Sequence, residues 1–225
     1  MDSGVILIFQ LIVLIFSVMI HEISHGYVAE RLGDPTARLA GRLTLNPLVH
    51  VSFFGMVILP ILSYFAWGMP VGGAKPVPYN PHNLKNPING GALIAAAGPL
   101  SNFLIAVIFG ILMRVISVVN APALLASSSF FSIIVYINIL LGVFNLVPLP
   151  PLDGSKVLNF FLPVKWQLLL DSFWDNVFNL IRNQWLLSLI IFIFFFQYVL
   201  TAVFFLIEPI IKLLYFAVAG HPAGF

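Results

Sequence analysis

The sequence contains no cysteine and very few charged residues. Without cysteine the chain has neither disulfide bonds nor thiolate ligands, which excludes cysteine-based zinc and redox sites. Only 8% of the 225 residues are charged, whereas a soluble domain carries about 25%. The formal net charge of +2 is too small to indicate nucleic-acid binding. Because 60% of the residues are hydrophobic, the composition favours burial in a lipid bilayer.

The hydrophobic residues are gathered into runs near the length of about 20 residues that a bilayer requires. These runs are Val5–Tyr27, Val51–Trp67, Gly90–Val119, Phe130–Val147 and Trp185–Val218. The first run is preceded by no Lys or Arg and followed by no small-residue cleavage site, so we expect a retained span rather than a signal peptide. The last run is longer than one span needs, so it forms either a tilted helix with a surface segment or a tight pair. We expect an all-α polytopic membrane protein with about five to six membrane segments.

The segment SVMIHEISHGYVAERLG places two histidines and a glutamate at the end of the first run. His21 and His25 are four residues apart, so on a helix they lie on one face, one turn apart. Two such imidazoles can bind one zinc ion, with Glu22 beside the metal to act on a water molecule. Ionisable groups inside a span are costly and mark function. The alternative is a structural role, in which the histidines only hydrogen-bond neighbouring helices.

A catalytic zinc ion takes three protein ligands, so a third must be found. The metzincin extension is absent, because Val28 and Arg31 stand where it has glycine and histidine. The remaining candidates are His50, His82, Asp34, Asp153, Asp171 and Asp175. Asp153 is the strongest, because FNLVPLPPLDGSKVL places it after the fourth run and after prolines that exclude regular helix. The alternative is that Asp153 only caps the helix that follows.

The distribution of basic residues agrees with a site that contains Asp153. If Asp153 meets the two histidines, the first and fourth runs end on one side, and the short loop Asn120–Ser129 makes the third and fourth runs antiparallel. Eight of the ten basic residues then lie on the metal side: Arg31, Arg38, Arg42, Lys75, Lys85, Lys156, Lys165 and Arg182. The positive-inside rule predicts that this side is cytoplasmic. The run Val51–Trp67, broken by Pro60, must then leave and return on one side, so we expect a re-entrant hairpin.

These motifs together resemble the site-2 protease family of intramembrane zinc metalloproteases. HEISH is similar to the family's HExxH, PLDG to its LDG segment, and AAGPLSNF to its GPxxN segment. FNLVPLPPLDG is similar to the longer NxxPxPxxDG form, and the motifs together cover about Ile20 to Leu158. The arrangement, without a PDZ or CBS domain, looks like the compact prokaryotic branch, in which AKPVPYNPHNLKNP also recurs.

The resemblance implies an enzyme that hydrolyses peptide bonds within or near the transmembrane helices of membrane-protein substrates. It implies one Zn²⁺ per chain, held by His21, His25 and Asp153, with Glu22 as the general base. Zinc generates a water nucleophile at neutral pH, and the glutamate accepts the proton and delivers it to the leaving amine.

The resemblance also places two asparagines, Asn102 and Asn145, near the reacting carbonyl, where an amide donor stabilises the oxyanion. The alternative for each asparagine is packing between helices, because polar side chains tie membrane helices together.

A substrate helix must unwind before it is cut, and its freed backbone groups then need new partners. Pairing with an edge strand supplies them. MPVGGAKPVPYNP is the candidate, because Gly72 and Gly73 allow close approach, Ala74 can run extended, and prolines 76 and 78 fit an edge position. We therefore expect a short extended substrate-binding strand at Gly72, Gly73 and Ala74. The alternative is an ordinary surface loop.

The expected organisation is a protease core at residues 1–160, with an amphipathic segment and the C-terminal membrane segments at residues 161–225 of the same membrane domain. The expected location is the prokaryotic plasma membrane, with the active site toward the cytoplasm. Partners are the lipid bilayer and a transmembrane protein or peptide substrate, and the sequence leaves open whether the chain forms a homo-oligomer. Two other functions compete: a divalent-metal transporter, which should show paired polar positions in its two halves, and an inactive homologue that binds membrane helices.

Overall fold

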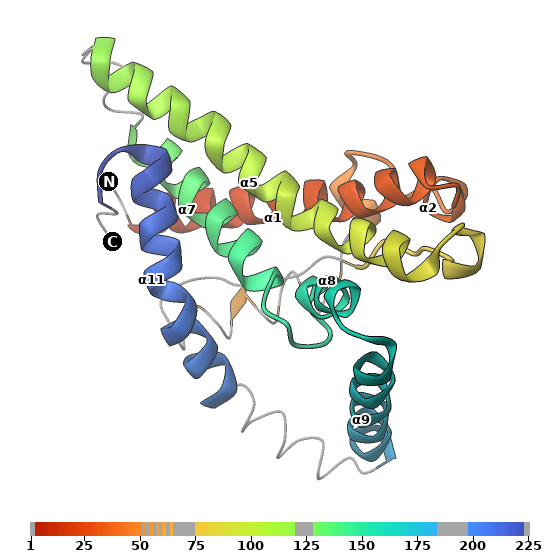
Figure 1. Cartoon of the computed structure of the whole chain (residues 1–225). Coiled ribbons are helices and arrows are strands. Elements are labelled where there is room, and N and C mark those ends of the chain that lie inside the picture. Colours follow the sequence, from red (N-terminus) through yellow and green to blue (C-terminus); the bar gives the residue numbers. More distant parts are fainter. Residues whose placement is uncertain are drawn as a thin grey trace.

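The computed structural model describes residues 3–50, 75–119, 128–183 and 198–222, with isolated positions between 51 and 74 (Figure 1). Every regular element within these residues is helical, which confirms the all-α fold class. In chain order the elements are α1 (Ser3–Arg31), α2 (Thr36–Leu39), α3 (Pro47–His50), the 3-10 helix η2 (Pro81–Asn83), α5 (Pro87–Val119), α7 (Ser128–Asn145), α8 (Asp153–Phe161), α9 (Val164–Asn183) and α11 (Leu200–Ala219).

Four of the described helices are long and apolar enough to cross a membrane. They are Gly4–Arg31, Pro87–Val119, Ser128–Asn145 and Thr201–Ala219. The first three correspond to the first, third and fourth predicted runs, and the last to the C-terminal part of the final run. The predicted hairpin at Val51–Trp67 and the beginning of the final run lie mostly outside the described residues. The expectation of five to six membrane segments therefore stays a prediction.

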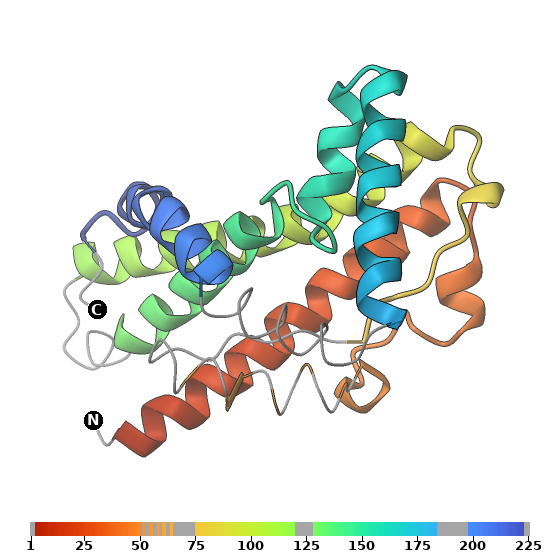
Figure 2. The ribbon, with the colours of Figure 1, turned by 90° about the horizontal axis from the view of Figure 1, so that it is seen from below.

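Helix α5 is the centre of the bundle and contacts α1, α7, α8 and α11. Helix α7 lies between α1 and α11 (Figure 2). Buried residues such as Met113, Ile139 and Ile211 join α5, α7 and α11 in one core cluster. A second cluster, which includes Val18 and Leu141, joins α1 to α7. The HEISH segment of α1 and the AAGPLSNF segment of α5 lie on helices that pack directly against each other, and α8, which begins at Asp153, packs against α5.

The outer face of α5 carries a stripe of exposed apolar side chains. Leu100, Leu104, Ile111 and Val115 are all exposed, and their spacing places them on one side of the helix. A surface of this kind is stable only when something apolar covers it. With four helices of membrane-spanning length, the covering medium is lipid, and the chain is an integral membrane protein.

Two amphipathic helices, α8 and α9, follow α7. Helix α8 packs against α5, and α9 projects away from the bundle (Figure 1). Gln167 fixes the corner between them, because its Nε2 donates hydrogen bonds to the carbonyl oxygens of Asn159 and Leu162 at 2.7 and 2.8 Å. The boundary expected at residues 160 and 161 falls at the end of α8.

Candidate metal centre

Helix α1 presents two histidines to the interior of the bundle, one helical turn apart. The ring centroids of His21 and His25 are 4.7 Å apart, and the rings meet nearly edge to face. His21 Nδ1 lies 2.6 Å from Asn102 Oδ1, and His25 Nδ1 lies 2.6 Å from the carbonyl oxygen of Ile94. The partner atoms come from α5, so this helix holds both rings from one side.

These hydrogen bonds decide which ring nitrogens can bind a metal. A carbonyl oxygen can only accept, so the Nδ1 atom of each histidine carries the proton and donates it. The lone pair of each ring is then on Nε2, and a neutral Nε2 is a ligand atom for zinc. The hydrogen bonds at Nδ1 therefore hold both rings in the tautomer whose Nε2 can bind a metal.

The carboxylate of Asp153 meets both Nε2 atoms. Its Oδ2 lies 3.0 Å from His21 Nε2 and 3.3 Å from His25 Nε2. Helix α8 begins at Asp153, after the turn at Leu146–Pro151, and a Cβ added at Gly154 would lie 2.2 Å from the carbonyl oxygen of Leu146. Only glycine permits this close approach of α8 to the end of α7, which carries Asp153 to the histidines.

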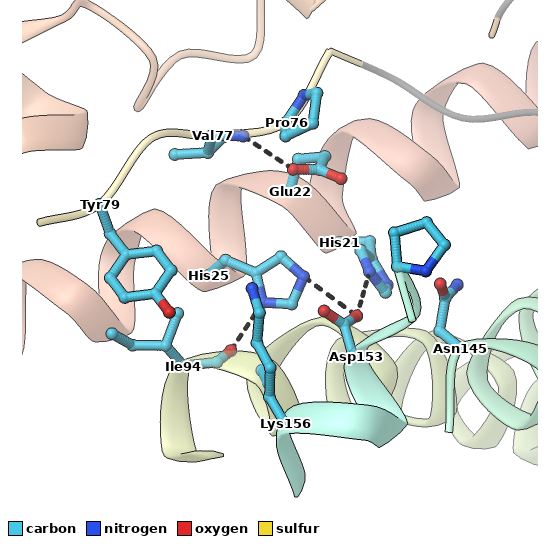
Figure 3. A pocket seen from close by; sticks show the side chains of 12 residues that line it. His21, Glu22, His25, Pro76, Val77, Tyr79, Ile94, Asn145, Asp153 and Lys156 are labelled. Carbon is cyan, nitrogen blue, oxygen red and sulfur yellow. Dashed lines mark hydrogen bonds and ion pairs between the residues drawn. The ribbon is translucent and has the colours of Figure 1, made fainter. Parts of the chain in front are cut away.

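The capping alternative for Asp153 finds no support in this geometry. The residue before the helix, Leu152, is the N-cap, and no side chain makes a capping hydrogen bond there. The carboxylate of Asp153 points to the histidines (Figure 3). An ionised carboxylate that faces two neutral Nε2 atoms is the arrangement that a metal ion requires of its ligands.

Glu22 lies beside this group and has a partner of its own. Its Oε2 accepts the backbone N–H of Val77 at 2.9 Å. Ligand atoms of His21, Glu22 and His25 all lie within 4.8 Å of one another, so Glu22 is also near enough to share a metal. Asp153 is nevertheless the better third ligand, because its Oδ2 is within 3.3 Å of both Nε2 atoms while Glu22 is held by Val77.

The backbone of α5 leaves space for a metal site at Gly98. A Cβ added there would lie 2.5 Å from His21 Nε2 and 2.6 Å from Cε1 of both rings. Any side chain at this position would therefore fill the place where the ligand atoms meet. Two neutral imidazoles and one carboxylate are also a ligand set that catalytic zinc sites use. The residues present fit a zinc ion, which His21, His25 and Asp153 would hold.

An extended stretch at residues 75–80 crosses Glu22 and closes one side of the site (Figure 3). Asp34 holds the C-terminal end of this stretch. Its Oδ2 accepts a hydrogen bond from the backbone N–H of Asn80 at 2.6 Å, and its Oδ1 accepts one from Asn83 Nδ2 at 2.7 Å. Burial opposes ionisation of Asp34, but hydrogen bonds from Thr36, Asn83 and Asn80 outweigh it and lower the pKa. Val77 packs at Gly26, where an added Cβ would lie 2.8 Å from its side chain. The stretch is thus anchored at both Glu22 and Asp34.

A cavity of about 250 Å³ lies over these groups. It is lined by His21, Glu22, His25, Pro76, Val77, Tyr79, Ile94, Ala95, Asn145, Pro151, Asp153 and Lys156. Lys156 brings a positive charge to this lining, with its Nζ 5.2 Å from the ring centroid of Tyr79. The cavity therefore contains the candidate metal ligands, a carboxylate base, an amide and a cation.

The structure brings His21, Glu22, His25 and Asp153 together, as expected from the sequence. Asn145 lines the cavity, and its Nδ2 donates to the carbonyl oxygen of Leu141 at 2.9 Å. Asn102 is fully buried behind His21 and is not among the residues that line the cavity. The predicted strand at Gly72, Gly73 and Ala74 lies outside the described residues.

The sequence reasoning missed two residues that contact this group from behind. Asn138 of α7 and Ser17 of α1 are buried and hydrogen-bonded to Asn102. The signal for Asn138 was present, because it is a polar residue inside the apolar run Phe130–Val147.

Comparison with known proteins shows the family of the chain. The chain matches the sequence model of peptidase family M50 over residues 9–121 and 112–189. It is 39% identical over 159 residues to Putative zinc metalloprotease YwhC of Bacillus subtilis, which is 69% of each chain. It is 28% identical over 167 residues to Zinc metalloprotease MJ0392 of Methanocaldococcus jannaschii, which is 74% of this chain and 38% of that protein. No solved structure matches.

The helical membrane fold and the histidine–carboxylate site define the chain as a membrane-embedded zinc metalloprotease. The chain belongs to peptidase family M50, the site-2 protease family. The resemblance drawn from the HEISH, AAGPLSNF and PLDG motifs is confirmed.

Proposed function

We propose that this protein hydrolyses peptide bonds within or near the transmembrane helices of other membrane proteins. His21, His25 and Asp153 bind one zinc ion in this proposal, and Glu22 is the general base. The observation that carries it is the convergence of Asp153 Oδ2 on both Nε2 atoms, at 3.0 and 3.3 Å, beside a carboxylate that faces the same cavity.

The chemistry divides between the metal and Glu22. A zinc ion held by His21, His25 and Asp153 would supply a water nucleophile at neutral pH and would polarise the scissile carbonyl. Glu22 takes a proton from the water molecule as the water oxygen bonds to the carbonyl carbon. It then passes the proton to the amide nitrogen as the C–N bond breaks. The Val77 N–H holds Oε2 and orients the carboxylate, which leaves Oε1 to receive the proton.

The two asparagines take different roles in this proposal. A side-chain amide nitrogen carries two protons. Asn145 uses one of them in its hydrogen bond to the carbonyl oxygen of Leu141, and the second can form a hydrogen bond with a substrate oxygen in the cavity. Asn102 directs its nitrogen to Ser17 O and Asn138 Oδ1, away from the cavity. We therefore assign oxyanion stabilisation to Asn145 and the positioning of His21 to Asn102.

The substrate needs backbone partners once it is unwound, and the extended stretch at residues 75–80 can give it few N–H groups. The N–H of Lys75 is donated to His50 O, that of Val77 to Glu22 and that of Asn80 to Asp34. Positions 76 and 78 are prolines, which leaves only the N–H of Tyr79 outside this set. We infer that further donors for the substrate come from the predicted strand at Gly72, Gly73 and Ala74, which lies outside the described residues.

We place the protein in a prokaryotic plasma membrane with its active site toward the cytoplasm. Arg31, Arg38 and Arg42 follow the metal-bearing end of α1, and Lys156 lines the cavity itself. Positive charge of this kind stays on the cytoplasmic side. Residues 1–160 form the protease core in this proposal, and residues 161–225 complete the same membrane domain.

The test compares two glutamates of α1 in purified protein reconstituted into liposomes with a model transmembrane peptide. Glu22→Gln should keep one zinc per chain and bind the peptide, but lower the cleavage rate by about 10²–10⁴-fold or more, because the proton acceptor is lost. Glu30→Gln is the matched control, because Glu30 pairs with Arg38 at the surface, and cleavage should be unchanged. If the wild type moves zinc across the liposome membrane and cuts no peptide, the protein is a transporter.

A further inference from the structure

A chain of buried hydrogen bonds runs from the metal site into the interior of the bundle. It joins His21 and Ser17 of α1 to Asn102 of α5 and Asn138 of α7. Ser17 is 4% exposed, and Asn102 and Asn138 are 0% exposed. Buried amides inside membrane spans are costly unless all their groups are satisfied, so this chain of bonds requires an explanation.

Two backbone carbonyls fix the direction in which the amides point. Asn138 Nδ2 donates to the carbonyl oxygen of Ile134 at 2.9 Å and to Ser17 Oγ at 2.9 Å. Asn102 Nδ2 faces the carbonyl oxygen of Ser17 at 3.4 Å. A backbone carbonyl oxygen can only accept a hydrogen bond. Rotating either side-chain amide by half a turn would therefore place its Oδ1 against a carbonyl oxygen, with no proton between them.

The fixed direction passes along the chain of bonds to His21. Because Asn138 Nδ2 is hydrogen-bonded to the carbonyl oxygen of Ile134, Asn138 Oδ1 faces Asn102 and accepts a hydrogen bond from its Nδ2 at 3.0 Å. Asn102 then turns Oδ1 to His21 Nδ1 at 2.6 Å. This oxygen accepts only, so Nδ1 must carry the proton and the lone pair must be on Nε2, which faces Asp153.

We propose that Asn138 is a positioning residue of the metal centre, which acts through Asn102 to hold His21 in the tautomer that binds zinc. The inference rests on the metal site proposed above and adds a residue that does not line the cavity. Outer contacts of this kind orient the ligand ring and typically change metal affinity by about 10–100-fold.

The second histidine provides an internal comparison. His25 Nδ1 donates directly to the backbone carbonyl of Ile94, so no side chain is needed to fix its tautomer. His21 instead depends on two side-chain amides that can rotate if a partner is removed. Loss of Asn138 should therefore disturb one of the two histidine ligands and leave the other in place.

The experiment measures zinc affinity by competition with a chelator, using the full-length protein in detergent. Asn138→Leu has similar size but cannot hydrogen-bond, and it should raise the zinc Kd by about 10–100-fold. Asn138→Asp should stay within about threefold of the wild type, because burial keeps the new carboxyl neutral and its O–H can replace the amide donor. Ile133→Ala removes packing from the same α1–α7 cluster and should leave the zinc Kd unchanged.

His21→Ala is the reference that separates this inference from the metal site itself. If His21→Ala binds zinc as tightly as the wild type, the proposed site is wrong. If His21→Ala weakens zinc binding and folded Asn138→Leu does not, the positioning role is wrong. Equal losses in Asn138→Leu and Ile133→Ala would also overturn it, because packing would then explain both.

A second substitution covers the case in which Asn138→Leu does not fold. Asn138→Ser can return its hydroxyl to the carbonyl of Ile134, but it is too short to reach Asn102. The same 10–100-fold loss is expected. Normal zinc affinity in folded Asn138→Ser would refute the inference.

Discussion

Gly98 is the position at which the smallest change should remove the metal. A Cβ added there would lie 2.5 Å from His21 Nε2 and 2.6 Å from His25 Cε1, whereas ordinary contacts begin at 3.4 Å. Gly98→Ala therefore requires the His21 ring or the α5 backbone to move by about 0.9 Å, the difference between these distances. Metal–ligand distances tolerate only about 0.2 Å.

The expected magnitude follows from two opposed effects. Replacing glycine by alanine within a helix favours the helix by about 1 kcal/mol, so Gly98→Ala should not unfold α5. The displaced ring should nevertheless weaken zinc binding by about 100-fold or more, because a ligand rather than an outer contact is moved. Cleavage should fall in parallel with zinc content.

The matched control on the same helix is Gly91→Ala. An added Cβ at Gly91 would meet only Tyr79 Oη at 3.7 Å, which is ordinary contact. Both variants make the same chemical change in the same helix, so only the clash distinguishes them. Zinc content is measured by elemental analysis and helix content by circular dichroism. If Gly98→Ala binds one zinc with wild-type affinity, the two histidines do not lie against α5 as described.

Substitutions at four other positions test the remaining parts of the site. Asp153→Asn should raise the zinc Kd by about 10–100-fold with the fold retained; full zinc occupancy at low free zinc would show that Asp153 is no ligand. Asp34→Asn should raise KM several-fold and leave zinc content unchanged, because the substitution frees the far end of the stretch at residues 75–80. The Asp34 carboxylate should stabilise the folded protein at pH values above the pKa that it has in the unfolded chain. This stabilisation should be lost as the pH falls through the lower pKa of the folded protein. Gly73→Pro should impair cleavage and spare zinc, and Gly73→Ala should be milder. A single cysteine at position 74 should crosslink to a cysteine near the scissile bond in the Glu22→Gln background; normal cleavage by Gly73→Pro without a crosslink would reduce the strand to a loop.

The helix period made the histidine pair predictable, because four residues on α1 place two side chains on one face. Asp153 required a topological argument, and the sequence could not exclude a capping role for it. In the structure Leu152 is the N-cap, and Asp153 Oδ2 lies 3.0 and 3.3 Å from the two Nε2 atoms. This placement depends on the close approach of α8 to the end of α7 at Gly154, which the sequence pattern does not reveal.

The outer contacts were beyond sequence reasoning for a different reason. In a span that is apolar on every side, the hydrophobic pattern does not say which face meets a neighbour. The direction of Asn138 toward Asn102 depends on the rotation of α7 about its own axis, which only packing sets. Asp34 is similar, because its bonds to Asn80 and Asn83 join segments far apart in the sequence.

The position of the histidines along α1 has a consequence for the products of the proposed reaction. His25 is six residues before the end of α1 at Arg31, or about 9 Å along the helix axis, near the margin of a bilayer core about 30 Å thick. A substrate helix cut at this depth yields two pieces of unequal hydrophobic length. The longer piece keeps nearly a full span and stays in the lipid, whereas the shorter has too few apolar residues to anchor it and carries a new charged terminus. It therefore departs into water, which separates the two products of the cut.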